Sequence, residues 1–330
     1  MAARHRLGLL LLLPASQIAG GCGAAPSALT PHGVGARHVA DLWWILAATA
    51  AAVYLVVMAL TAIALVRRRT PIRDDQAAVR WVVIGGLGIP AAVVGVLFVV
   101  AVGALGRLAG PPSPAALAIE VTGYQWWWSV TYQRGDERVV TANEIHVPVG
   151  VPVRLRLLSA DVIHSFWVPA LAGKLDLVPG QVNETWLQAE RPGVYRGQCA
   201  EFCGLQHARM GLLVVAQPAA EFEAWWRQQR EPAAAPSDPV GARGLEVFAR
   251  NCAGCHAVRG TAAFYGRTGP DLTHLASRRT LAAGVLDNVR GALAGWIANP
   301  QVLKPGNRMP PVALTSEDLH AVVRYLEGLR

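Results

Sequence analysis

Charged residues are scarce in this sequence, and their distribution is uneven. Only 16% of the 330 residues are charged, whereas 53% are hydrophobic. Two runs, 42–66 and 81–105, contain no charged residue, and each exceeds the roughly 20 residues that an α-helix needs to cross about 30 Å of hydrocarbon. This composition is unusual for a soluble protein. We therefore expect both runs to be transmembrane helices in a lipid membrane.

The two apolar runs are separated by a short basic segment. It contains four arginines, which form part of a net charge of +8: Arg67, Arg68, Arg69 and Arg73. Because basic loops stay on the cytoplasmic side of a membrane, this cluster indicates topology rather than nucleic-acid binding. The sequence therefore predicts a multi-pass protein of the bacterial cell (inner) membrane, with everything from about Ala109 onward on the extracytoplasmic side and no nucleic-acid partner.

The N-terminus has the pattern of a secretory signal peptide over residues 1–22. A basic start is followed by an apolar run at 9–13, which is too short to span a bilayer, and then by small residues. Small residues before Cys22 also fit lipoprotein-type cleavage, in which Cys22 would be acylated. However, Ala19 stands where such sites usually carry leucine, so ordinary cleavage remains the alternative.

The pattern of hydrophobic and polar residues changes after the second apolar run. Residues 117–215 contain short, alternating, β-branched runs separated by glycine and proline, which are typical of an antiparallel β sandwich or barrel. An Ala- and Pro-rich stretch at 231–239 reads as a linker. The predicted organisation is therefore two transmembrane helices in 39–108, a β domain in 109–230, the linker 231–239 and a third domain in 240–330.

The five cysteines are too few for a disulfide-rich fold, and two of them form a haem-attachment motif. Cys252, Cys255 and His256 have the spacing C-x-x-C-H, in which the thiols bind haem c covalently and the histidine ligates iron. Met309 is the only methionine after residue 240 and supplies the thioether for the second axial position. A Cys252–Cys255 disulfide is the alternative. Residues 315–330 predict an amphipathic helix that closes a small all-α domain, with His274 and His320 as surface or packing residues.

The remaining two cysteines lie together with other soft ligands. Cys199, Cys203, His207 and Met210 fall within twelve residues. The spacing also fits a zinc site or a structural disulfide. Zinc does not ordinarily use a thioether, and His164 in "SADVIHSFWVP" offers a second imidazole. Thiolate, thioether and imidazole together favour a copper electron-transfer site.

The candidate ligands and the haem-attachment motif together resemble a known family. "CAEFCGLQHARM" with "DVIHSFWVP" resembles the dinuclear copper (CuA) site of cytochrome c oxidase subunit II, and the C-terminal part resembles a class I cytochrome c. The resemblance implies a multidomain membrane protein with a two-helix transmembrane hairpin, an antiparallel cupredoxin-like β domain and an all-α cytochrome c domain. It also implies six copper ligands, with both thiolates bridging two coppers: His164, Cys199, Glu201 through its backbone carbonyl, Cys203, His207 and Met210.

The resemblance carries further implications for single residues. Trp126 in "GYQWWW" matches the aromatic residue through which electrons reach the copper domain. The Glu201 side chain matches a magnesium ligand at the interface with the catalytic subunit, and the segment 173–180 with Asp176 resembles part of the same interface. The sequence departs from the family at one place. Many members carry a glutamate at the entrance of a proton channel, but residues 80–90 of this sequence contain no acidic residue, although Asp74 and Asp75 lie just upstream. A role in proton uptake therefore stays open.

The function implied is that of an electron-input subunit of a terminal haem-copper oxidase. Its expected cofactors are haem c and the dinuclear copper centre, with magnesium as a possible third. Its expected partners are the catalytic subunit I, other oxidase subunits, and cytochrome c or another donor. The same module in a nitric oxide reductase is the nearest alternative. A membrane copper sensor or assembly protein would explain the cysteines but not the haem motif or the two membrane spans.

Overall fold

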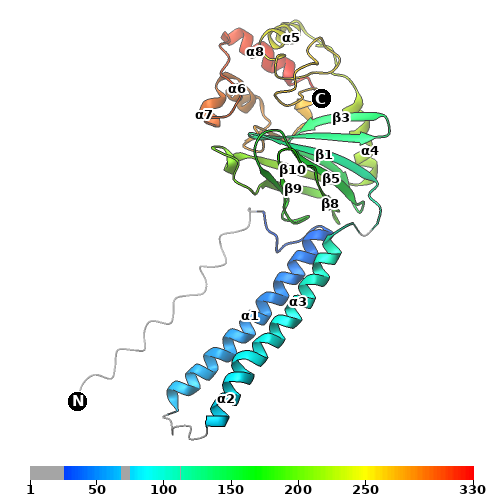
Figure 1. Ribbon diagram of the computed structural model, residues 1–330. Coiled ribbons are helices and arrows are strands. Elements are labelled where there is room, and N and C mark those ends of the chain that lie inside the picture. Colours follow the sequence, from blue (N-terminus) through cyan, green and yellow to red (C-terminus); the bar gives the residue numbers. More distant parts are fainter. Residues whose placement is uncertain (1–25, 68–74, 112) are drawn as a thin grey trace, which may run out of the picture.

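The computed structural model describes residues 26–67, 75–111 and 113–330. The predicted signal peptide lies outside the described residues, as do Arg68, Arg69, Arg73 and Asp74, and the side chain of Asp75 is likewise not described. Figure 1 shows three parts in chain order: a long helical hairpin, a β domain, and a small helical domain on the side of the β domain away from the hairpin.

The hairpin consists of two helices that are long and apolar enough to cross a membrane, Val34–Val66 (α1) and Gln76–Leu108. Both predicted apolar runs lie within them. The second helix divides into α2 (Asp75–Val83), a π-helical turn (Ile84–Gly88) and α3 (Ile89–Leu108). Pro90 has no N–H to donate to the carbonyl four residues earlier, and a π turn is a common way for a helix to absorb such a break. Most of the large apolar side chains of the hairpin are exposed, as lipid contact requires.

The β domain contains ten strands in two five-stranded sheets. One sheet has the order β3-β2-β1-β5-β8 and the other β4-β10-β9-β6-β7. The strands in chain order are β1 (Leu117–Tyr124), β2 (Trp127–Arg134), β3 (Glu137–Ala142), β4 (Glu144–Pro148), β5 (Val153–Ser159), β6 (His164–Trp167), β7 (Leu175–Leu177), β8 (Asn183–Leu187), β9 (Gly193–Cys199) and β10 (Gly211–Gln217).

The predicted antiparallel sandwich is confirmed, and two of its strand pairs are exceptions to the antiparallel pattern. Strand β1 pairs with β5 in parallel, and β10 pairs with β4 in parallel. The chain leaves the first sheet after β3, runs β4 in the second sheet, and returns as β5 beside β1 in the same direction. Alternating side chains show which face of a strand is buried, but they do not show its direction.

The core of the sandwich follows the alternation seen in the sequence. Ile119 and Val121 of β1 and Leu155 and Leu157 of β5 are completely buried between the sheets, and burial of each such side chain contributes about 1.5–3 kcal/mol. Helix α4 (Ala219–Arg230) adds apolar side chains to the same core. This core supports the loops that carry the predicted copper ligands.

The C-terminal domain is helical, as predicted, with one addition. Its helices are α5 (Pro239–Asn251), α6 (Arg290–Ala298), α7 (Pro300–Leu303) and α8 (Ser316–Leu326). A two-residue ladder joins β11 (Thr280–Leu281) to β12 (Leu286–Asp287). Thr315 caps α8 because its hydroxyl accepts from the backbone N–H of Asp318 at 3.1 Å, and the apolar stripe of α8 forms a separate core with α5.

Candidate copper centre and haem-attachment site

The predicted copper ligands lie on a loop between two paired strands. We call residues 199–210 the ligand loop. It joins β9 to β10, which are antiparallel neighbours, and the N–H of Cys199 donates to the carbonyl of Met210 at 2.9 Å. His164 begins β6, and the β6–β9 pairing places Phe166 opposite Cys199. Sheet pairing thus brings an imidazole from 35 residues earlier to the base of the ligand loop.

The first half of the site forms around Cys199. Its Sγ lies 3.7 Å from Cys203 Sγ and 3.9 Å from His164 Nδ1. The backbone carbonyl oxygen of Glu201 lies 3.1 Å from the same sulfur. Cys199 and Cys203 are each 3% exposed and His164 is fully buried, so soft donors and a carbonyl converge in a site that excludes bulk water.

The second half forms around Cys203 in the same way. Its Sγ lies 3.7 Å from His207 Nδ1 and 3.8 Å from Met210 Sδ. Each thiol therefore has one imidazole and one weak donor beside it, and the two thiols adjoin each other. This arrangement fits the copper site that the resemblance implies, because imidazole, thiolate and thioether are ligands that copper accepts.

The two thiols differ in their readiness to lose a proton. The hydrogen bond from Cys203, together with one from His164, outweighs burial and lowers the pKa of Cys199 to about 3. The same pairing, with burial, raises the pKa of Cys203. Because thiolates are the metal-binding form, Cys199 is already prepared as a ligand, and metal binding would displace the proton that remains on Cys203.

Asp161 orients the buried imidazole of His164. Its Oδ1 lies 2.8 Å from His164 Nε2, which leaves Nδ1 facing Cys199. The same carboxylate accepts from the backbone N–H of Val162 and of Gln125, each at 2.7 Å. Carboxylates commonly fix ligand histidines in this way. The sequence reasoning missed Asp161, although a carboxylate three residues before a proposed ligand histidine was a signal for it.

The other side of His164 is bounded by the backbone of β1. A Cβ on Gly123 would lie 2.8 Å from His164 Cδ2, which is closer than side chains pack. Glycine at this position therefore lets the imidazole lie against the strand. With Asp161 on the ring nitrogen, this contact leaves the ring one orientation.

Trp126 contacts the ligand loop directly. Its indole Nε1 donates to the carbonyl of Cys203 at 3.0 Å, and the neighbouring Gln125 Nε2 donates to the same oxygen at 2.7 Å. A Cβ on Gly204, whose φ is +110°, would lie 3.0 Å from the Trp126 ring, so this glycine allows the close approach. Trp126 is therefore connected to a predicted copper ligand by one hydrogen bond.

The next two tryptophans have different surroundings. Trp127 stacks on Tyr124, with ring centroids 4.6 Å apart, and Trp128 is fully buried against Phe166. These are the alternating environments of a strand. Among these three tryptophans, Trp126 is the one that hydrogen-bonds to the ligand loop.

The haem-attachment motif follows α5 in a tight turn. The carbonyl of Cys252 accepts the N–H groups of Cys255 at 3.1 Å and of His256 at 3.0 Å. Both thiols are free, and Cys255 is exposed. His256 Nδ1 lies 2.8 Å from the carbonyl of Pro270, so Nδ1 donates and Nε2 is left for iron. Burial lowers the pKa of His256, which favours the neutral imidazole that a metal ligand requires.

Met309 is held by a different segment of the domain. Its N–H donates to Asn307 Oδ1 at 2.8 Å, and its carbonyl accepts from Gln301 Nε2 at 2.9 Å. The pairing of Met309 with His256 across a haem remains a prediction. His274 is 3% exposed and contacts the carbonyls of Arg330 and Glu231, as predicted for a packing residue.

Comparisons with known proteins find the same two domains. The sequence model of the periplasmic domain of cytochrome c oxidase subunit II matches residues 133–217, and that of cytochrome c matches residues 241–330. The chain is 41% identical over 214 residues to cytochrome c oxidase subunit 2 of Alkalihalophilus pseudofirmus, which covers 64% of this chain and 61% of the relative.

Two further relatives carry the same name. The chain is 34% identical to cytochrome c oxidase subunit 2 of Bacillus sp. strain PS3, covering 65% of this chain and 62% of that one. It is 32% identical to that of Bacillus subtilis, covering 67% and 64%. The aligned region thus spans about three fifths of each relative's length. These matches confirm the resemblance: the chain carries a cytochrome c oxidase subunit II periplasmic domain followed by a cytochrome c domain.

Proposed function

We propose that this chain is the electron-input subunit of a terminal haem-copper oxidase. It accepts electrons from a donor at its cytochrome c domain and delivers them, from the ligand loop, to a catalytic membrane subunit that reduces oxygen to water. The observation that carries the proposal is the convergence of six candidate copper ligands, four of them from buried residues, in one site beside Trp126.

The residues that would hold the cofactors divide into two sets. In the haem domain, Cys252 and Cys255 would bind haem c covalently, and His256 and Met309 would ligate its iron. In the β domain the copper ligands are His164, Cys199, the Glu201 carbonyl, Cys203, His207 and Met210. When bound, both groups supply one-electron redox chemistry.

The protein's contribution at the copper centre is rigidity. Backbone hydrogen bonds between β9 and β10 fix both ends of the ligand loop, and the Cys199–Met210 bond closes it. Asp161 and Gly123 limit the His164 ring to one orientation. A site whose ligands cannot move needs little rearrangement when its charge changes, and this favours fast electron transfer.

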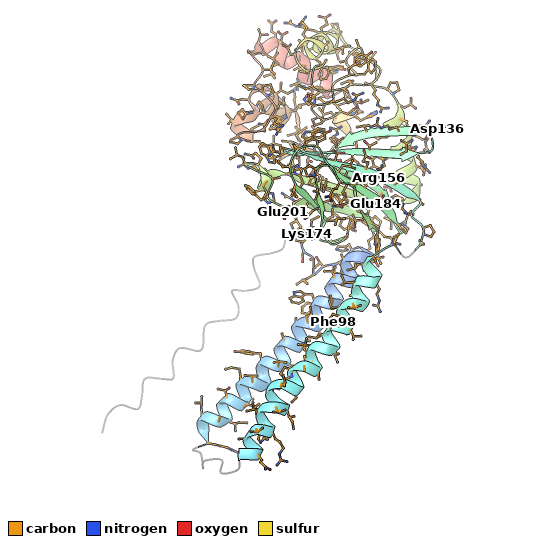
Figure 2. The ribbon with its side chains drawn as sticks, in the orientation of Figure 1. Phe98, Asp136, Arg156, Lys174, Glu184 and Glu201 are labelled. Carbon is orange, nitrogen blue, oxygen red and sulfur yellow. The ribbon has the colours of Figure 1, made fainter. Side chains whose placement is uncertain are left out.

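The partner surface is proposed to lie on the side of the β domain nearer the membrane helices. Figure 2 shows Glu201 and Lys174 toward that side in the view, away from the haem domain. We assign the Glu201 side chain to magnesium at the interface with the catalytic subunit, with Asp176 in a neighbouring part of the same surface. A carboxylate oxygen suits this hard cation.

The purified complex provides the test. We expect two coppers and one covalent haem per chain, and oxygen consumption with a reduced cytochrome c as donor. Cys203→Ser should lose copper and keep the haem, whereas Cys252→Ser should impair haem attachment and keep the copper. Zinc in place of copper, or a Cys199–Cys203 disulfide in the isolated protein, would contradict the proposal. Turnover of nitric oxide instead of oxygen would assign the chain to a nitric oxide reductase.

A further inference from the structure

One short segment of the haem domain contacts the ligand loop directly. We call residues 303–308, which begin at the last residue of α7, the docking segment. The carbonyl of Leu303 accepts from Arg209 Nη1 at 2.9 Å, and the carbonyl of Pro305 accepts from Gln206 Nε2. Both donors belong to the ligand loop. Side chains that lie between proposed copper ligands therefore hold the backbone of the haem domain.

Lys304 is the buried centre of this contact. Its side chain is 2% exposed, and its Nζ donates to the carbonyl of Trp126 at 2.9 Å and to the carbonyl of Ala282 at 3.0 Å. One acceptor comes from each domain. Lys304 makes no ion pair within the described part of the chain, and burying an amine without a carboxylate is costly. The sequence contains only one other lysine, the exposed Lys174.

A second contact leads from the docking segment to Cys203. The guanidinium of Arg308 donates to Gln125 Oε1, and Gln125 Nε2 donates to the carbonyl of Cys203 at 2.7 Å. Arg308 directly precedes Met309, the proposed haem ligand. Two successive hydrogen bonds thus join the neighbour of a haem ligand to a copper ligand.

A third contact involves a turn of the haem domain between β11 and β12. Ala282 and Ala283 have φ values of +54° and +61°, a conformation that costs energy for alanine and persists only where surrounding contacts impose it. The carbonyl of Ala283 accepts from the N–H of Gly211, next to Met210, at 2.9 Å. The turn is therefore held by two hydrogen bonds, one from Lys304 to the carbonyl of Ala282 and one from Gly211 to the carbonyl of Ala283.

We propose that Lys304 is a positioning residue that fixes the haem domain on Trp126, so that electrons reach the copper centre from one docked geometry without domain motion. This inference rests on the proposed function. The group that Cys252 and Cys255 would hold would give up one electron, and the centre that the ligand loop would hold would accept it, so the exchange balances and no bond forms or breaks. Because small displacements of reacting groups slow a reaction steeply, loss of the anchor should affect the rate more than either cofactor.

The test replaces Lys304 in the complete purified complex. Lys304→Met keeps an unbranched side chain that is one atom shorter, and it removes both hydrogen bonds. Arg250→Met, at an exposed cation of α5, is the matched control. After flash reduction of the haem by a photosensitiser, we expect electron transfer to the dicopper centre to slow at least tenfold in Lys304→Met and to become dependent on solvent viscosity. The parent and the control should be fast and independent of viscosity, and all three should have the same haem and copper spectra.

The outcomes separate the two proposals. If the parent shows no transfer from haem to dicopper, the proposed function fails. If the parent transfers electrons and Lys304→Met matches it in rate and viscosity dependence, the role of Lys304 is overturned. Pulsed electron paramagnetic resonance gives an independent readout, because the distribution of haem-to-dicopper distances should be narrow in the parent and broad in the variant.

A measurement on the unmodified protein covers the case in which the variant fails to assemble. Lys304 should react with a water-soluble amine-labelling reagent at least a hundredfold more slowly in the native complex than in the denatured complex, as followed by mass spectrometry of its peptide. Equal rates in the native and denatured samples would show that the docking segment is open, and would overturn the inference.

Discussion

Asp161→Asn tests whether the carboxylate beside His164 prepares the copper site. Asp161 Oδ1 lies 2.8 Å from His164 Nε2 and 2.7 Å from the N–H of Val162, and its Oδ2 lies 2.7 Å from the N–H of Gln125. When His164 Nδ1 ligates a metal, the proton of the imidazole is on Nε2. All three neighbours then donate hydrogen bonds to the Asp161 carboxylate. Asparagine has one acceptor oxygen, so its NH2 group must face a donor on one side or the other.

The magnitude follows from the bonds at stake. A hydrogen bond to a charged group contributes about 1.5–3 kcal/mol, and loss of a carboxylate that orients a metal-binding histidine typically costs about 10–100-fold in metal affinity. The two figures agree, because tenfold corresponds to about 1.4 kcal/mol. We therefore expect copper affinity to fall by about 10–100-fold in Asp161→Asn, while the haem content stays unchanged.

The assay is retention of copper by the purified complex during titration with a competing chelator, followed by the dicopper absorption and electron paramagnetic resonance. Asp136→Asn is the control, because Asp136 is exposed in the turn between β2 and β3 and Figure 2 shows it at the far edge of the β domain from Glu201. Equal copper retention in Asp161→Asn, Asp136→Asn and the parent would refute the reasoning.

Three further predictions concern electron transfer, the partner interface and domain docking. Trp126→Leu should keep both cofactors and slow haem-to-dicopper transfer by more than tenfold, or about 1.4 kcal/mol of barrier, and an unchanged flash-induced rate would make Trp126 a packing residue. Glu201→Gln should keep the coppers, because the backbone carbonyl remains, and should lose manganese that has been substituted for magnesium at the interface. Loss of copper with manganese retained would instead make the Glu201 side chain a copper ligand. Burial lowers the pKa of Lys304 from 10.5 to about 7, although Cys203 raises it and Arg209 adds to the lowering. Between pH 7 and pH 10.5 the undocked amine binds more protons than the docked amine, so docking of the haem domain should strengthen as the pH rises above about 7. Distributions of haem-to-dicopper distance that are equally narrow at pH 6 and pH 9, measured by pulsed electron paramagnetic resonance, would contradict this.

The sequence by itself determined the parts of this protein that depend on neighbours along the chain. An uncharged run of 25 residues predicts a membrane-spanning helix wherever it occurs, because its length and polarity match the bilayer. The motif of Cys252, Cys255 and His256 is equally local. Alternating β-branched residues predicted a sandwich or barrel, and the spacing of Cys199, Cys203, His207 and Met210 placed four candidate ligands in one loop.

Only the tertiary structure decided which distant segments meet. The β6–β9 pairing brings His164 to Cys199, and strand crossing between the sheets makes β1 and β5 parallel. Neither feature follows from local periodicity, because pairing partners and strand direction are set by how the whole chain is packed. Asp161 and Lys304 look like ordinary polar residues in the sequence. They differ from others because folding buries Lys304 and half-buries Asp161, and each then hydrogen-bonds to groups of the protein in place of bulk water.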